Sequence, residues 1–193
     1  MIKKTLAILA GGKSSRMNYN DKALLTYKEK NFIEHIINSG KDFGEIIVIS
    51  NNKYLYNVLP VKVFNDIYLG KGPLSGIHSA LKNAKYDKVL CIACDMPLIT
   101  ENTLNLIGSI TEEYEVLVPK VKGKLQPLCS VYSKNLIPKV EKALINNQNK
   151  LQKFIMSTNY KVVEDKNHKE LDEKYFLNIN TTEEYSNFLV SEN

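Results

Sequence analysis

Short apolar runs alternate with amphipathic stretches along the chain. The runs are rich in β-branched residues, have the length of buried strands, and span residues 5–9, 45–50, 61–64, 88–94, 115–118, 128–132 and 160–163. Apolar residues recur at helical spacing over residues 32–39, 74–84, 100–110, 136–145 and 181–189. Alternating strands and helices, with strands that are apolar almost throughout, are typical of a mostly parallel sheet covered by helices on both faces. The pattern therefore predicts an α/β fold.

Local signals support these boundaries. Thr100 can cap one helix, and Thr181 with Glu184 three residues later forms the capping-box pattern before another. The lysine-rich segment 120–125 indicates a hairpin or loop, and the polar stretch 164–175 indicates a surface loop. The sequence shows no internal repeat and no linker, so we expect one domain over residues 1–193.

Charge and hydropathy narrow the class of protein. The net charge of +5 comes mostly from scattered lysines, without the basic run or aromatic ladder that would indicate nucleic-acid binding. The apolar run after Lys3 and Lys4 is too short for a signal peptide, and basic residues follow it. No stretch approaches the length of a membrane span. We therefore expect a cytoplasmic protein that binds neither nucleic acid nor membrane.

The cysteines predict no redox or metal site. Cys91 and Cys94 match a C-x-x-C pattern, but they lie in an apolar run that predicts a strand. Positions i and i+3 of a strand point to opposite faces, so these two thiols cannot chelate one ion. We expect both, and Cys129, to be buried core residues.

Polar residues follow four of the predicted strands. Because ligands bind at the carboxyl ends of parallel strands, these residues should gather at one edge of the sheet. They are Gly11, Gly12 and Arg16 after the first strand, Asn51 and Asn52 after the second, Asn65 and Asp66 after the third, and Asp95 after the fourth.

The loop after the first strand has the composition of a phosphate-binding loop. Gly11 and Gly12 allow backbone N–H groups to approach phosphate oxygens, and Arg16 and Lys22 supply positive charge. The loop matches neither the dinucleotide-binding G-x-G-x-x-G pattern nor the P-loop. A plain tight turn would explain the two glycines but not the basic residues with them.

Three further motifs allow a functional and a structural interpretation. Asp95 after a buried strand suits Mg²⁺, which prefers oxygen ligands, or it caps the turn before Pro97. The glycine-punctuated segment 71–77 opens a helix whose N-terminus suits an anion or a nucleobase edge, or it is a rigid connector. Asn178 and Asn180 alternate along an extended segment and face one ligand, or Asn180 with Thr181 shapes the start of the last helix.

The chain lacks the residues of nucleophilic or base catalysis. None of the three histidines stands beside a candidate nucleophile or at metal-ligand spacing. Transfer to a phosphate nucleophile needs no general base, because phosphate is already ionised near neutral pH. Positioning and charge stabilisation can then provide most of the catalysis.

Taken together, these motifs resemble those of the molybdenum cofactor guanylyltransferases. The resemblance covers nearly the whole chain, in family order. It rests on Leu9-Ala10-Gly11-Gly12-x-Ser14-x-Arg16-Met17, Asp21-Lys22, Gly72-Pro73-Leu74-x-Gly76, Cys94-Asp95-Met96-Pro97, Gln126-Pro127-Leu128 and Asn178-x-Asn180-Thr181. One departure is Asn18, which stands where the family commonly has glycine; asparagine tolerates a positive φ better than other non-glycine residues.

The resemblance implies a Rossmann-like nucleotidyltransferase that uses Mg²⁺ to join GMP, from GTP, to the terminal phosphate of molybdenum-molybdopterin. It implies that Leu9, Ala10, Gly11, Gly12 and Lys22 hold the GTP phosphates, and that Arg16 stabilises charge on the α-phosphate or pyrophosphate. It further implies that Asn52 and Asp66 contact the nucleotide, that Asp95 binds Mg²⁺, and that Asn178 and Asn180 lie on the molybdopterin side. Molybdenum-insertion proteins and molybdoenzymes are the implied protein partners.

Two alternative functions remain. A related nucleotidyltransferase would use CTP, as molybdopterin cytidylyltransferases do, or a sugar phosphate. A non-catalytic nucleotide- or cofactor-binding protein would not need Arg16, Lys22 and Asp95 together.

Overall fold

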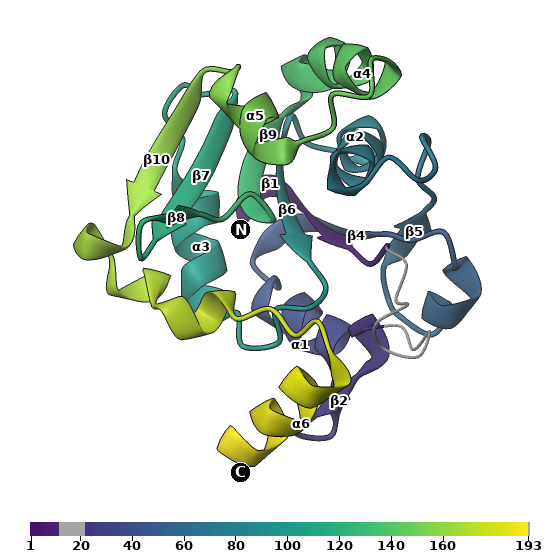
Figure 1. Ribbon diagram of the computed structural model, residues 1–193, viewed down its shortest axis with the longest axis vertical. Helices are drawn as coiled ribbons and strands as arrows, with labels where there is room; N and C mark the ends of the chain where they lie inside the picture. The colour runs from purple at the N-terminus through teal and green to yellow at the C-terminus, as the bar shows by residue number, and fades with distance from the viewer. Residues whose placement is uncertain (12–21, 193) are drawn as a thin grey trace.

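The computed structural model describes residues 1–11 and 22–192. Its central sheet runs in the order β10-β7-β9-β6-β1-β4-β5, with β8 paired to β7 (Figure 1). The strands of this sheet are β1 (Ile2–Leu9), β4 (Phe43–Ile49), β5 (Lys62–Phe64), β6 (Lys88–Ala93), β7 (Val116–Val121), β8 (Lys124–Leu125), β9 (Cys129–Ser133) and β10 (Tyr160–Glu164).

The sheet is mostly parallel, as the sequence predicts. β1 pairs in parallel with β4 and β6, β4 with β5, and β10 with β7. The exception in the middle is β9, which lies antiparallel between β6 and β7. The chain reaches β9 through the β7–β8 hairpin, whose turn residues Lys122 and Gly123 both have positive φ (48° and 76°). Of the two expectations for residues 120–125, a hairpin or a loop, the structure shows the hairpin.

Helices cover both faces of the sheet (Figure 1). One face packs on α1 (Phe32–Ser39) and α3 (Glu101–Ser109); the other packs on α2 (Pro73–Asn83), α4 (Ile137–Ile145) and α5 (Leu151–Met156). Side chains of β1 alternate between the two faces. Leu6 and Ile8 pack on the face covered by α1 and α3, and Ala7 and Leu9 pack on the face covered by α2, α4 and α5. This two-faced burial explains the nearly continuous apolar strands in the sequence.

A third, smaller apolar cluster lies beside the main sheet. It joins the hairpin of β2 (Thr26–Tyr27) and β3 (Lys30–Asn31) to the C-terminal helix α6 (Thr182–Ser191). Its buried members are Tyr27, Phe32, Ile179 and Phe188. In Figure 1, α6 and β2 lie next to one another below the sheet.

Several expectations are confirmed and one is wrong in part. All three cysteines are buried, and Cys91 and Cys94 belong to the cores on opposite faces of the sheet. The polar stretch 164–175 forms short 3-10 turns rather than a plain surface loop. Leu171 within it is buried in the core, and Thr103 donates a hydrogen bond to the carbonyl of Glu170. Leu171 and the partly buried Tyr175, together with this hydrogen bond, attach an otherwise polar segment to the core.

Within residues 1–11 and 22–192, no helix is both long and apolar enough to cross a membrane.

Candidate active site

The register of the central strands brings their carboxyl ends to one edge. Leu9 of β1 pairs with both Ile49 of β4 and Ala93 of β6, and Ile49 pairs with Phe64 of β5. The residues that follow these four strands therefore emerge side by side. Backbone bonds continue the alignment past the strand ends, from Ala10 N to Ile49 O (2.9 Å) and from Cys94 N to Leu9 O (3.2 Å).

One part of this edge, the β6 side, consists of Lys22, Asp95 and Asn180. Lys22 Nζ lies 2.7 Å from Asn180 Oδ1 and 3.4 Å from Asp95 Oδ2. Lys22 is in the 3-10 turn Lys22–Leu24, Asp95 follows β6, and Asn180 precedes α6. Three segments far apart in the sequence thus place a cation, a carboxylate and an amide together.

Asp95 is held in a position where its charge is costly. Burial raises the pKa of this carboxyl above its ordinary value, while the ammonium group of Lys22 partly counters that effect. Its second oxygen, Oδ1, is buried and has no hydrogen-bond partner among the described residues. A buried carboxylate oxygen without a partner is costly unless a ligand binds it.

The buried oxygen of Asp95 makes this residue suitable as a Mg²⁺ ligand. The free oxygen is a hard donor of the kind that Mg²⁺ prefers, and Mg²⁺ is usually bound by one or two carboxylates together with water and substrate phosphates. In the described part of the chain, no cluster of three or more His, Cys, Asp or Glu residues is suited to hold a metal by itself. A divalent ion at Asp95 would need further oxygen ligands from water or from a bound substrate.

The other part of the edge, the β4–β5 side, centres on Asn51 and Asp66. Asn51 Nδ2 donates to Asp66 Oδ2 (3.0 Å), and the backbone N–H of Asp66 donates to Asn51 Oδ1 (2.9 Å). Asp66 is half-buried, and this burial raises the pKa of its carboxyl above the ordinary value. The hydrogen bond from Asn51 counters part of that effect. Its Oδ1 is also buried without a partner in the described residues. This pair presents a fixed acceptor for N–H donors.

Two glycines leave room around Asp66. A Cβ on Gly11 would lie 3.7 Å from Asp66 Oδ2, and one on Gly76 would lie 3.8 Å from Asp66 Oδ1 and 3.4 Å from Leu9. Gly76 lies in the first turn of α2, which begins after Gly72 at a φ of 74°. The expected helix start at residues 71–77 therefore adjoins the strand edge, with its first turn beside Asp66.

The other predicted site residues divide into three groups. Leu9 and Ala10 end β1 at the edge, and Asn52 follows β4 with an exposed side chain. The Asn178 amide donates to the carbonyl of Phe176 in its own segment (3.2 Å), whereas the Asn180 amide oxygen accepts from Lys22 (2.7 Å). Gly12 and Arg16 lie outside the described residues.

Sequence reasoning missed two residues of this region. The sequence predicts Asn51 at a strand end without a role of its own, whereas in the structure Asn51 holds Asp66 through two hydrogen bonds. For Glu184 the sequence predicts only a capping box. The signal for Asn51 is its place beside Asp66 on neighbouring strands, whereas the capping-box pattern does not predict that Glu184 also binds the backbone of Asn180.

The fold and this strand edge define a nucleotidyltransferase. The family model described as the MobA-like NTP transferase domain matches residues 6–163, and the chain belongs to this family. Its relatives have a narrower name. A Clostridium perfringens (strain ATCC 13124) protein named "Probable molybdenum cofactor guanylyltransferase" is 53% identical over 98% of this chain and 98% of its own length. A Carboxydothermus hydrogenoformans protein of the same name is 38% identical over 96% of this chain and 94% of its own.

A solved structure shares the fold. The molybdopterin-guanine dinucleotide biosynthesis protein A from Archaeoglobus fulgidus superposes with a TM-score of 0.81, covering 98% of this chain and 100% of that one. The two sequences are 22% identical, so the likeness concerns the fold alone.

Proposed function

We propose that this chain transfers GMP from GTP to the terminal phosphate of molybdenum-molybdopterin and releases pyrophosphate. The observation that carries the proposal is the meeting of Lys22, Asp95 and Asn180 at one strand edge, where Asp95 Oδ1 is buried and unpartnered within the described residues. The choice of guanine as the base and of the molybdenum cofactor as the acceptor is supported by the names of the relatives, which align over almost the whole chain.

The roles of the residues follow from their chemistry. In the reaction, an acceptor phosphate oxygen bonds to the α-phosphorus of GTP, and the bond from that phosphorus to the β-phosphate oxygen breaks. The acceptor is already an anion, so no residue need remove a proton from it. Lys22 neutralises charge on the triphosphate and on the departing pyrophosphate, together with Arg16. The backbone of Leu9 to Gly12 holds the phosphates.

Asp95 would hold Mg²⁺ through Oδ1, the oxygen that has no partner in the described part of the chain. Bound there, Mg²⁺ would supply electrophilic stabilisation of phosphate charge. Asp95 needs an ionised carboxyl for this, and the nearby Lys22 ammonium favours that form.

Selection of guanine would fall to the β4–β5 side. Asp66 Oδ1, which has no partner among the described residues, can accept a hydrogen bond from a guanine N–H, and Asn51 holds the carboxyl in place. Asn52, exposed next to this pair, would contact the nucleotide. Asn178 and Asn180 would lie on the molybdopterin side, and molybdenum-insertion proteins and molybdoenzymes would be the partners before and after the reaction.

The test is transfer of label from α-labelled GTP, with Mg²⁺ and molybdenum-molybdopterin as acceptor. We expect one labelled GMP in the dinucleotide product for each pyrophosphate released. Transfer from CTP in place of GTP would make the chain a cytidylyltransferase, and transfer to a sugar phosphate would change the acceptor. If no triphosphate yields pyrophosphate, the chain is a binding protein and the proposal is wrong.

A further inference from the structure

The carboxylate of Glu184 holds more than the start of α6. Glu184 Oε2 accepts a hydrogen bond from the backbone N–H of Asn180 (2.6 Å) and another from that of Thr181 (3.2 Å). Thr181 Oγ1 accepts in return from Glu184 N (3.1 Å). The Thr181 bonds form an ordinary capping box, but the shortest bond of the set goes to the residue before the cap. That residue is the one whose side chain reaches Lys22.

The segment before Asn180 is anchored from the other side. The backbone N–H of Ile179 donates to the carbonyl of Asp95 (3.1 Å), and the Ile179 side chain is buried in the third apolar cluster. Asn180 therefore lies between a bond to the end of β6 and a bond to Glu184. Fixing the backbone on both sides restricts where its amide oxygen can lie, and this oxygen is 2.7 Å from Lys22 Nζ.

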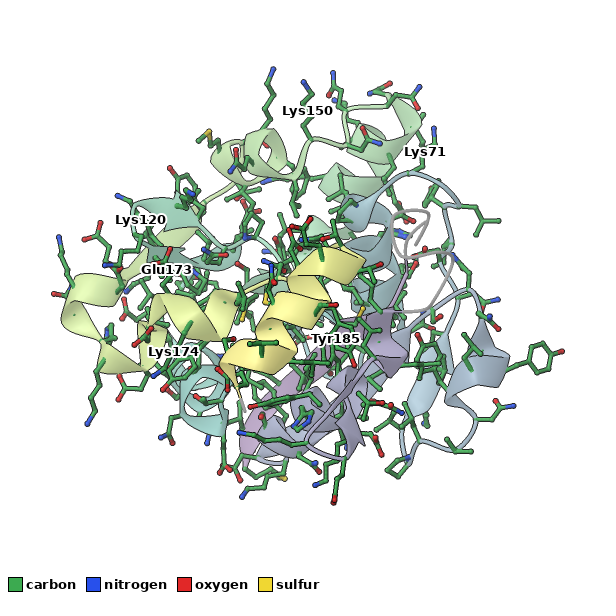
Figure 2. All side chains as sticks on the ribbon, turned by 60° about the horizontal axis from the view of Figure 1, so that its bottom comes forward. Lys71, Lys120, Lys150, Glu173, Lys174 and Tyr185 are labelled. Carbon is green, nitrogen blue, oxygen red and sulfur yellow. The ribbon has the colours of Figure 1, made fainter. Side chains whose placement is uncertain are left out.

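The helix α6 is also attached to the segment that contains Lys22. The hairpin of β2 and β3 follows the Lys22 turn directly, and Tyr185 donates to the carbonyl of Thr26 (2.7 Å). Tyr27 and Phe188 pack with ring centroids 4.8 Å apart. Figure 2 shows Tyr185 on α6, in front of the hairpin region. Lys22 and Asn180 thus come just before two elements, the β2–β3 hairpin and α6, that pack on each other.

We propose that Glu184 is a positioning residue that acts on Lys22 through Asn180. It fixes the Asn180 backbone, the Asn180 amide oxygen accepts from the ammonium group of Lys22, and the ammonium is held near Asp95. The role of Lys22 in the reaction rests on the proposed function, whereas its positioning by Glu184 and Asn180 does not. Glu184 and Asn180 lie beyond residues 6–163, the range that the family model matches. The C-terminal segment therefore supplies a part of the site from outside that range.

The arrangement is tested without any substrate by acylating lysines with a limiting amount of an amine reagent. Mass spectrometry compares Lys22, whose side chain is 20% exposed, with exposed Lys150 as the internal standard, which Figure 2 shows far from α6. We expect Glu184→Ala and Asn180→Ala to raise the acylation of Lys22 by the same factor, about fivefold for the loss of one hydrogen bond. Glu184→Gln keeps an acceptor oxygen and should stay near the wild-type value.

The matched control is Glu34→Ala at the start of α1. Glu34 Oε2 accepts from the backbone N–H of Asn31 (2.7 Å), so this variant loses the same kind of bond at another helix start. It should leave Lys22 acylation unchanged. The proposal is overturned if Lys22 is acylated equally in Glu34→Ala and Glu184→Ala. It is also overturned if a folded Glu184→Ala shows the wild-type acylation of Lys22. If thermal melts show that Glu184→Ala has lost its fold, Glu184→Asp, which shortens the reach, has the same expected increase.

Kinetics give the second readout. With GTP and acceptor saturating, Glu184→Ala should lower kcat about tenfold, and Glu184→Gln should restore it. The double variant Glu184→Ala with Asn180→Ala should be no slower than Asn180→Ala alone. Both substitutions break the same chain of contacts, from Glu184 through Asn180 to Lys22. Additive losses would contradict action through Asn180. If the wild type transfers no GMP while the acylation pattern holds, the proposed function fails and the positioning of Lys22 by Glu184 stands.

Discussion

The two sides of the strand edge are built in different ways. On the β4–β5 side, Asn51 and Asp66 follow neighbouring strands and are 15 positions apart, and two bonds join them. On the β6 side, Lys22 meets Asp95 across 73 positions and Asn180 across 158. The first side depends on the pairing of neighbouring strands, whereas the second also needs the C-terminal segment to pack in place. Changes far from the edge should therefore disturb the β6 side more.

The largest expected effect is that of Asp95→Asn. The substitution removes the charge that would hold Mg²⁺, so turnover should fall on the order of a thousandfold, as expected for several kcal/mol of lost stabilisation. The measurement is kcat/KM for GMP transfer, with circular dichroism to confirm the fold. Asp66→Asn, on the other side of the edge, should lose at most about tenfold, because it removes a contact to the base and not to the metal. If Asp95→Asn keeps full activity, Asp95 does not hold the metal.

The next effect is that of Asn180→Ala. Lys22 Nζ loses its acceptor at 2.7 Å, and hydrogen bonds to charged groups contribute about 1.5–3 kcal/mol. We expect kcat to fall roughly thirtyfold at saturating GTP. A kcat within twofold of wild type would show that the amide of Asn180 is not needed to position Lys22, and that the β6 side depends on Asp95 alone.

A smaller effect is expected for Asp66→Asn, in base preference rather than in rate. Inosine triphosphate lacks the exocyclic amine of guanine, so it loses a donor that Asp66 would accept. The wild type should prefer GTP over inosine triphosphate by about tenfold in kcat/KM, and the variant should lose most of this preference. If the preference is unchanged, Asp66 contacts another part of the nucleotide.

The smallest effect concerns the stability of the ligand-free protein. Burial raises the pKa of Asp95 in the folded state, whereas in the unfolded chain the carboxyl titrates at about 4. Between these two pKa values the folded state binds the proton more strongly. Stability therefore falls as pH rises through that window and changes no further above it.

Thermal melts across pH check this sign. At pH 7, Asp95→Asn should unfold a few degrees above the wild type, since about 1 kcal/mol corresponds to about 3 °C for a chain of this size. The difference should shrink toward pH 4. A variant that is less stable than the wild type at pH 7 would mean that the Lys22 contact outweighs the cost of burial.

Much of the fold could be read from the sequence because the signals are local. Every run predicted as a strand is a strand, and Thr100 and Thr181 cap their helices as expected. The hairpin of β2 and β3 was not predicted, because strands of two residues are too short to show a period. The short helix α5 was missed for a similar reason.

The sequence by itself determined which residues end the strands, and so which chemistry gathers at one edge. Gly11, Asp66 and Asp95 follow apolar runs, and parallel pairing brings such ends together. Only the tertiary structure decided that β9 lies antiparallel between β6 and β7, and that Asn180 meets Lys22. These pairings join segments distant in sequence, and they depend on the packing of Ile179, Phe188 and Tyr27 into one cluster, which no local pattern encodes.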